Sequence, residues 1–316
     1  MADGSYQLSH RSGDVIDGKY RLLRCLGEGG TSWVWLAHHT ALDLQVALKL
    51  AKPGCTRVGV ALAEARMLAS LDHPAIVRVM DSGRTVLGEP YLAMEHLHGE
   101  ALATVLVRDV CLPATRTVRL LAPIFDATAY CHANGIVHRD IKPENIFLCR
   151  TANGTQPKLI DFGVARRTCG DDGEWGISGT PGYMAPEQVS DPMRVDLRSD
   201  IWALCAVLYE LIAGTTAVQG DDWQRRLAMT TECEIPPLPA REAAATRLWP
   251  ILERGLQRAP ERRFASVGEL RSALARWLDH EERRVETPVT HALPQRSAPR
   301  PRRQLQWAQA YHPTAT

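Results

Sequence analysis

Hydrophobic and polar residues alternate in short runs over the first third of the chain. Between residues 20 and 97 turn residues separate these runs, which is the pattern of β-strands. One segment departs from the alternation: residues 60–71 are rich in alanine and carry apolar residues at near-helical spacing, so we expect a single helix there. The expected strands are Tyr20–Leu26, Val34–His38, Gln45–Leu50, Ile76–Asp81 and Tyr91–Glu95.

From about residue 101 to residue 279 the apolar positions recur three and four residues apart, as they do on amphipathic helices. The segment Ile201–Ala213 is apolar at nearly every position and predicts a buried central helix. The pattern therefore predicts an α+β protein with a β-rich first lobe that holds one helix, and a mainly helical second lobe. The other expected helices are Thr115–Ala133, Trp249–Leu256 and Ser266–Asp279.

The two ends of the chain differ from this pattern. Residues 1–19 are polar, and we expect a flexible leader there. Residues 287–316 contain four arginines and five prolines but no Asp, Glu or Lys, so we expect a basic, disordered tail over residues 280–316. The folded domain would then span residues 20–279, with its lobes at 20–97 and 98–279.

Composition narrows the class of protein. Of the 316 residues 45% are hydrophobic and 23% are charged, which excludes disorder of the whole chain. No apolar run approaches 18 residues and residues 1–20 lack an apolar core, so we expect neither a membrane segment nor a secretory signal. A net charge of +1 argues against a nucleic-acid or membrane partner for the whole chain. Eight cysteines without a Cys-x-x-Cys pair are typical of reduced thiols, and we expect a cytoplasmic protein.

Glycines and lysines supply the first candidate chemistry. Gly27 and Gly29 lie between two expected strands, where backbone N–H groups could approach phosphate oxygens, although a plain hairpin turn would use the same residues. Of 37 basic residues 32 are arginine and only five are lysine, so each lysine is informative. Lys49 ends an apolar strand, where an unpaired charge is costly. Glu64, in the one helix of this lobe, could pair with it; a solvated lysine at the edge of the sheet is the alternative.

The second lobe carries a more specific pattern. An acid, a lysine and an amide lie within six residues at Asp140, Lys142 and Asn145, and Asp161 follows 21 residues after Asp140. Asn145 and Asp161 offer the oxygen ligands that Mg²⁺ prefers. Asp140 can accept the proton of a hydroxyl nucleophile, and Lys142 can place positive charge near a transferring phosphoryl group.

In combination and order these motifs resemble those of the eukaryotic-type (Hanks-type) serine/threonine protein kinases, and residues 179–188 are most similar to the bacterial members. The resemblance covers Tyr20–Asp279. It implies a bilobal protein-kinase fold, ATP and Mg²⁺ as cofactors, and transfer of the γ-phosphoryl group to Ser/Thr hydroxyls of proteins, including the kinase itself.

The resemblance also assigns a role to individual residues around ATP. Lys49 would hold the α- and β-phosphates and pair with Glu64. The remaining nucleotide contacts would be Gly27 and Gly29 over the phosphates, Val34, Ala47 and Phe147 around the adenine, Met94 as gatekeeper, and Glu95 and Leu97 in the hinge.

The phosphoryl-transfer residues follow in the same way. Asp140 would orient or deprotonate the substrate hydroxyl, Lys142 would stabilise the γ-phosphoryl group, and Asn145 and Asp161 would bind Mg²⁺. The resemblance also implies three supporting contacts. Thr180 would contact Asp140 and Lys142, Glu187 would pair with Arg263, and Asp200 would brace the backbone of the catalytic loop.

Arg139 precedes the catalytic aspartate. In the family an arginine at this position often binds a phosphorylated residue of the activation segment, here residues 161–187. Thr168 and Ser178 are the candidate autophosphorylation sites. The alternative is a loop that needs no phosphate, with the acidic residues of the same segment supplying the negative charge.

Two other functions compete with an active kinase. A pseudokinase-like signalling scaffold would bind without catalysis, but every reacting residue named above is present. A small-molecule phosphotransferase of related fold would generally lack the stretch at residues 179–187, which shapes a peptide-binding shelf. Protein substrates with Ser/Thr acceptors are therefore the expected partners; control by other proteins, by a kinase–kinase dimer or by the tail stays open.

Overall fold

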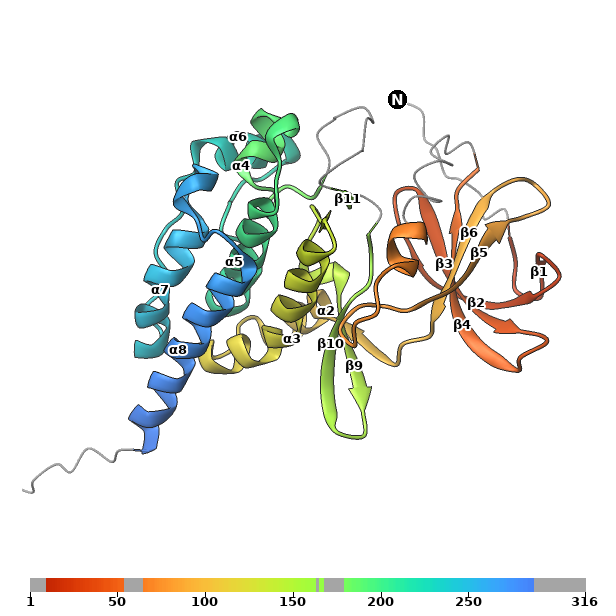
Figure 1. The fold of residues 1–316 in the computed structure, drawn as a ribbon, viewed down its shortest axis with the longest axis horizontal. Coiled ribbons are helices and arrows are strands. Elements are labelled where there is room, and N and C mark those ends of the chain that lie inside the picture. Colours follow the sequence, from red (N-terminus) through yellow and green to blue (C-terminus); the bar gives the residue numbers. More distant parts are fainter. Residues whose placement is uncertain (1–9, 54–64, 163–164, 168–178, 287–316) are drawn as a thin grey trace, which may run out of the picture.

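The computed structural model describes residues 10–53, 65–162, 165–167 and 179–286 of the chain. Strands gather at one end of the molecule and helices at the other, with the hairpin of two further strands between them (Figure 1). The predicted bilobal α+β class is confirmed.

The first lobe is built on a six-stranded sheet with the strand order β1-β2-β3-β4-β6-β5. Along β4 the side chains of Val46, Leu48 and Leu50 are buried on one face, while Ala47 and Lys49 point to the other face, because successive side chains alternate in a strand. The strands are β1 (Val15–Ile16), β2 (Tyr20–Glu28), β3 (Ser32–His39), β4 (Leu44–Ala51), β5 (Val79–Arg84) and β6 (Pro90–Glu95).

The expected strand at Ile76–Asp81 is shifted in the structure. Strand β5 begins at Val79, whereas Ile76 forms a single parallel bridge to Leu159 of the second lobe. Hydrophobic alternation marked this segment correctly as extended, but the partner of its first residues comes from elsewhere in the chain. Of the expected helix at residues 60–71, the described part is helical at residues 65–69.

The prediction of a flexible leader over residues 1–19 is wrong for residues 10–19. Residues Val15 and Ile16 form β1 and pair with Arg21 and Tyr20 of β2, and Ile16 is 4% exposed. His10 is also buried. A two-residue strand has too little periodicity to be recognised in sequence, and tertiary burial stabilises it. Residues 1–9 lie outside the described part.

The second lobe packs its helices around α5, which is buried at nearly every position and confirms the predicted central helix (Figure 1). Helix α7 begins at Ala243, six residues before the expected start. The helices are α2 (Leu102–Asp109), α3 (Ala114–Ala133), α4 (Pro186–Ser190), α5 (Arg198–Ala213), α6 (Trp223–Glu232), α7 (Ala243–Gly255) and α8 (Val267–Glu286), with 3₁₀ turns η1 (Pro143–Asn145), η2 (Pro192–Arg194) and η3 (Pro260–Arg262).

Two small sheets in this lobe were not predicted. Strands β9 (Ile146–Thr151) and β10 (Gly154–Leu159) form a hairpin, and β7 (Gly99–Ala101) pairs with β9. Strand β8 (Ile136–Val137) pairs with β11 (Arg166–Arg167). Since β8 and β9 flank residues 138–145, the small sheets fix both ends of the loop that carries the candidate catalytic residues.

Helix α8 continues to Glu286, seven residues past the expected domain end at residue 279. Its start follows the predicted capping pattern, because the backbone N–H of Glu269 donates to the Ser266 hydroxyl at 3.1 Å. Its last turns are held to the lobe by ion pairs of Glu281 with Arg247 and of Glu282 with Arg119. The domain is therefore longer than expected, and residues 287–316 lie outside the described part.

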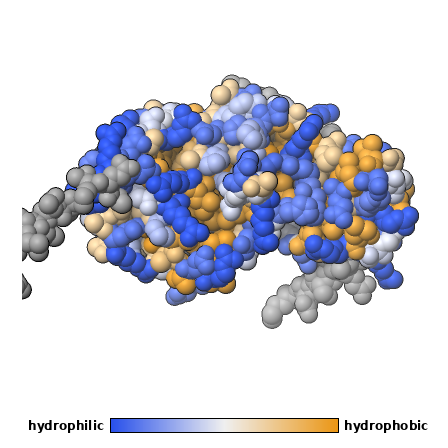
Figure 2. Space-filling view, turned by 90° about the horizontal axis from the view of Figure 1, so that it is seen from below, coloured by the Kyte–Doolittle hydropathy of each residue, from blue (hydrophilic) through white to orange (hydrophobic). Residues whose placement is uncertain are grey.

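Seen from below, the surface is a mixture of hydrophilic residues and scattered hydrophobic ones (Figure 2). None of the helices in the described ranges is both long and apolar enough to span a membrane.

The Arg247–Glu281 pair gives a first test. Glu281 is 5% exposed and accepts from the Arg247 Nε at 2.6 Å. We expect Glu281→Gln to lower the free energy of unfolding by about 1–2 kcal/mol, because the buried side chain at this position loses the charge that binds the Arg247 guanidinium. Glu282→Gln removes an exposed pair and should cost less than about 0.5 kcal/mol.

Chemical denaturation monitored by circular dichroism measures both changes. The hydrogen bonds from Arg247 lower the pKa of Glu281. The ionised carboxylate therefore contributes to the stability of the fold above the ordinary pKa of 4.5, and this stabilisation is lost as the pH falls through the lowered pKa. The difference between wild type and Glu281→Gln should therefore shrink in acid. Equal stability of Glu281→Gln and wild type at neutral pH would contradict this interpretation of the helix end.

Candidate active site

The loop at residues 138–145 is held by one buried carboxylate. Asp200, in the first turn of α5, is fully buried and accepts hydrogen bonds from the backbone N–H groups of His138 and Arg139, both at 2.8 Å. Its third bond is to the Nε2 of His132, also at 2.8 Å. Arg139 adopts a left-handed conformation with φ of 68°, which the loop needs in order to turn. Asp200 thus lies where the resemblance puts the brace of the catalytic loop.

Electrostatics keep this brace ionised. Burial alone raises the pKa of Asp200, but the hydrogen bonds from His132 and from the backbone of His138 outweigh burial and hold its pKa below the ordinary value of 3.8. Burial lowers the pKa of His138, whose ring packs against Phe162 with 4.5 Å between the ring centroids. His138 is therefore neutral near pH 7 and acts as a packing residue.

Four polar side chains of different chemistry meet beyond this turn. The Thr180 hydroxyl donates to Asp140 Oδ1 at 3.0 Å and accepts from the Lys142 Nζ at 2.5 Å. Lys142 Nζ also lies 2.9 Å from Asp140 Oδ2. The Asn145 amide donates to the carbonyl oxygen of Asp140 at 2.8 Å and to its Oδ2 at 3.1 Å. A carboxylate, an ammonium, an amide and a hydroxyl are thus fixed around one point.

The first lobe contributes a lysine to the same region. Lys49 points away from the buried face of β4, and its Nζ donates to Asp161 Oδ1 of the second lobe at 2.9 Å. The side chain of Asp161 keeps 42% of its surface exposed, whereas Phe162 is buried in the core of the second lobe. The sequence did not predict the Lys49–Asp161 pair, and Glu64, the expected partner of Lys49, lies outside the described residues.

The glycine-rich turn joins β2 and β3. Gly27 pairs with Val34 across the two strands, and the backbone N–H of Gly29 donates to the carbonyl oxygen of Ser32 at 2.8 Å, which closes the turn. The Lys52 Nζ lies 2.6 Å from Glu28 and lies over the Trp33 ring, so a charged pair flanks the turn. The turn therefore lies at the start of β3, which carries Val34 and pairs with β4, the strand of Lys49.

The residues assigned to the adenine belong to strands of both lobes and to the segment that joins them. Val34 lies directly opposite Lys49, and Ala47 lies opposite Met94 in β6, so all three belong to adjoining strands. Leu97 follows β6 and packs against the core of the second lobe. Phe147 is half-buried in β9.

The hinge contains a contact that sequence reasoning missed. Glu95 accepts from the Lys158 Nζ of β10 at 2.5 Å and from the backbone N–H of Arg78 at 2.9 Å. A signal was present, because Lys158 is one of only five lysines. In the structure each of the five has a carboxylate within 3.2 Å. In this chain a lysine therefore indicates an ion pair at all five positions, and not only at Lys49 and Lys142, which the motifs assigned.

A second buried ion pair supports the segment after the catalytic loop. Glu187 accepts two hydrogen bonds from Arg263, both at 2.7 Å, and the Arg263 side chain is fully buried over the Trp202 ring. The neighbouring Gln188 donates to the carbonyl oxygen of Arg139 at 2.8 Å, which ties α4 to the catalytic loop. The phosphosite candidates Thr168 and Ser178 lie outside the described residues.

A divalent cation fits the residues present. No group of three or more His, Cys, Asp or Glu side chains is arranged to hold a metal ion in the described ranges. However, Asn145 uses its amide nitrogen for both bonds to Asp140, which leaves its oxygen available, and the Asp161 carboxylate is partly exposed. Two oxygen donors that require phosphate oxygens to complete the shell suit a cation that arrives with a nucleotide.

Comparison with known proteins agrees with this geometry. The protein kinase domain model matches residues 20–274. The serine/threonine-protein kinase pkn2 of Myxococcus xanthus is 34% identical over 275 residues, which cover 83% of this chain and 32% of that protein. The serine/threonine-protein kinase pkn3 of the same organism is 33% identical over 303 residues (90% and 54%), and PknB of Mycobacterium tuberculosis is 33% identical over 274 residues (83% and 43%).

The chain thus spans between a third and about half of the length of these curated relatives. Members of the family use ATP and a divalent metal ion, and the matched residues include the whole of the site described above. The chain belongs to the protein kinase family and is similar to bacterial serine/threonine kinases of the eukaryotic (Hanks) type.

Proposed function

We propose that the chain transfers the γ-phosphoryl group of ATP to serine and threonine hydroxyls of proteins, its own included. The single observation that carries this proposal is the hydrogen-bonded group of Asp140, Lys142, Asn145 and Thr180, which lies between the brace Asp200 and the partly exposed Asp161.

Each member of this group has a task in phosphoryl transfer. Asp140 presents a carboxylate that can orient the acceptor hydroxyl and take its proton. Lys142 stands 2.9 Å from that carboxylate, where its charge can stabilise the phosphoryl group as it moves to the acceptor. The Thr180 hydroxyl bridges both, so it fixes their separation before a substrate binds.

The residues of the nucleotide site would act by positioning. Lys49 is already directed towards Asp161 and would exchange part of that contact for the α- and β-phosphates. Asn145 and Asp161 would hold Mg²⁺, which when bound neutralises negative charge on the phosphates. The hinge from Glu95 to Leu97 and the walls formed by Val34, Ala47, Met94 and Phe147 would enclose the adenine. Gly27 and Gly29 would cover the phosphates.

Protein acceptors are favoured over small molecules because residues 179–187 form a supported segment beside the catalytic group. Thr180 at its start contacts Asp140, and Glu187 at its end is anchored by Arg263. The pseudokinase alternative is disfavoured, because the assigned lysines, aspartates and amide are all present. We also propose a cytoplasmic location, no nucleic-acid partner and, for autophosphorylation, an encounter between two copies.

Transfer of labelled phosphate from ATP to the chain and to a generic basic protein substrate, with Mg²⁺, tests the proposal. Asp140→Asn should reduce the rate by about 10²–10⁴-fold while nucleotide still binds, because the proton acceptor is lost. Asp161→Ala should abolish transfer, because a metal ligand is lost. Asp43→Asn, whose side chain is 94% exposed in the first lobe, serves as the control and should be fully active. Nucleotide binding without transfer in the wild type would instead favour the scaffold.

Autophosphorylation is expected on the segment that follows Asp161. We propose Thr168 and Ser178 as the acceptors, with Arg139 as the cation that binds the phosphate, since guanidinium–phosphate pairs are strong and bidentate. Mass spectrometry of the chain after incubation with Mg-ATP should find phosphate on one or both residues and none in Asp161→Ala. Phosphate absent from residues 161–187 in an active sample would contradict the assignment.

A further inference from the structure

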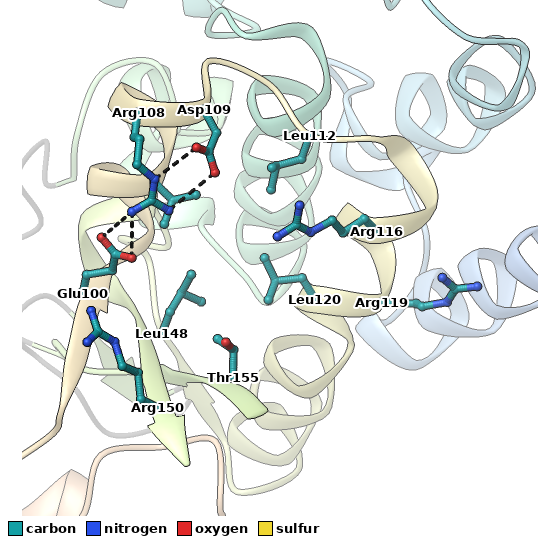
Figure 3. Close-up of a pocket in the computed structure, with 11 residues that line it drawn as sticks. Glu100, Arg108, Asp109, Leu112, Arg116, Arg119, Leu120, Leu148, Arg150 and Thr155 are labelled. Atoms are coloured by element: carbon teal, nitrogen blue, oxygen red, sulfur yellow. Dashed lines mark hydrogen bonds and ion pairs between the residues drawn. The ribbon is translucent and has the colours of Figure 1, made fainter. Parts of the chain in front are cut away.

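A groove of about 450 Å³ lies in the second lobe between α2, α3 and the β9–β10 hairpin (Figure 3). None of the residues assigned to nucleotide binding or phosphoryl transfer lines it. In Figure 1 the hairpin extends towards the lower edge of the molecule, whereas β11, which pairs beside the catalytic loop, lies in the upper half. The groove is therefore separate from the site described above.

The floor of the groove is apolar. Val105 and Leu112 are each 6% exposed and Leu148 is 7% exposed, with Leu120 beside them. These side chains come from α2, the segment that follows it, β9 and α3. The floor is thus made by four separate segments, and it offers a surface for aliphatic side chains.

The rim of the groove is rich in arginine, and only some of these arginines have a carboxylate partner in the described part of the chain. Arg108 bonds to Glu100 at 3.1 and 3.2 Å and to Asp109 at 3.0 Å, so carboxylates of the rim itself compensate this arginine. Arg119 pairs with Glu282 of α8 and points away from the groove in Figure 3.

Arg116 and Arg150 differ from these two. Both are exposed, and neither side chain has a hydrogen bond or a carboxylate partner in the described part of the chain. Figure 3 shows them on opposite sides of the groove, Arg116 on α3 and Arg150 on β9, with Leu120 and Leu148 between them. Two uncompensated guanidinium groups thus flank an apolar floor.

We propose that this groove is a docking site for an acidic, leucine-containing segment of the protein substrates, an inference that rests on the proposed kinase function. Carboxylates of the segment would bind Arg116 and Arg150, since the planar guanidinium accommodates carboxylates in a bidentate way. Its aliphatic side chains would cover Leu120 and Leu148. A nucleic acid or a free anion would use the arginines but leave the apolar floor uncovered.

The chain's own C-terminal tail does not fit as the occupant. Residues 287–316 follow α8 in the sequence, and Glu282 of α8 pairs with Arg119, one of the residues that line the groove. However, this stretch contains four arginines and no Asp or Glu, so its charge has the same sign as the unpaired arginines. Charge complementarity favours a separate, acidic partner.

Direct binding measures the docking step without any chemistry. The probe is a short fluorescent peptide in which glutamate and leucine alternate, and its anisotropy is followed as the full chain is added. Reversal of both charges in Arg116→Glu/Arg150→Glu should weaken binding about tenfold or more. Arg84→Glu is the matched control, because Arg84 is exposed in β5 of the other lobe and has no side-chain partner in the described ranges; its affinity should equal that of the wild type.

Three outcomes of this titration would overturn the proposal. They are equal binding by wild type and the double variant, equal binding of a peptide with lysine in place of glutamate, and complete displacement of the probe by single-stranded DNA at an equal concentration. Thermal melting by circular dichroism verifies that the variants are folded.

Kinetics separate docking from the proposed function. With the acidic segment joined by a flexible linker to a serine acceptor, the double variant should raise KM several-fold and leave kcat unchanged, because a remote contact adds uniform binding. An equal KM for both proteins would overturn the proposal. If the wild type transfers no phosphate to any acceptor but the peptide still distinguishes the double variant, docking stands and the kinase function fails.

Discussion

The geometry of the site depends on one buried carboxylate. Asp200 accepts the backbone N–H groups of His138 and Arg139, and the loop can turn there only because those bonds offset a left-handed residue, whose strain costs about 1–3 kcal/mol. The next residues then project Asp140, Lys142 and Asn145 towards one another. The catalytic group is therefore set by a helix of the core, and this explains why its side chains are already hydrogen-bonded to each other without a substrate.

Two charged contacts join the lobes, in addition to the apolar core and the Ile76–Leu159 bridge that they share. Lys49 reaches Asp161 from β4, and Glu95 at the end of β6 meets Lys158 of β10. The first pair lies on the face of β4 opposite the buried Val46, so strand alternation itself directs the lysine to the second lobe. The Lys49–Asp161 contact can be exchanged for phosphate oxygens, which suits lobes that close over a nucleotide.

Sequence reasoning was accurate where a regular pattern or a motif was long enough. The strands around Lys49 and the helix at Ile201–Ala213 follow from hydrophobic spacing, and the catalytic residues follow from a family resemblance. The strand at Val15–Ile16, the last turns of α8 and the pair of strands beside the catalytic loop could not be predicted, because contacts with distant residues stabilise these short elements. The unpaired arginines of the groove likewise become visible only when separate elements are placed side by side.

The central claim is that Asp200 positions the catalytic loop, and the kinetics of Asp200→Asn test it most directly. An isosteric amide loses the charge that binds two backbone N–H groups, so kcat should fall by about 10²-fold or more in protein that circular dichroism shows to be folded, since small misplacements of catalytic groups are costly. Affinity for the nucleotide should change little, because Lys49 and the hinge do not contact Asp200. His132→Gln leaves both backbone bonds in place and should retain most of the activity. An unchanged kcat in folded Asp200→Asn would contradict the account.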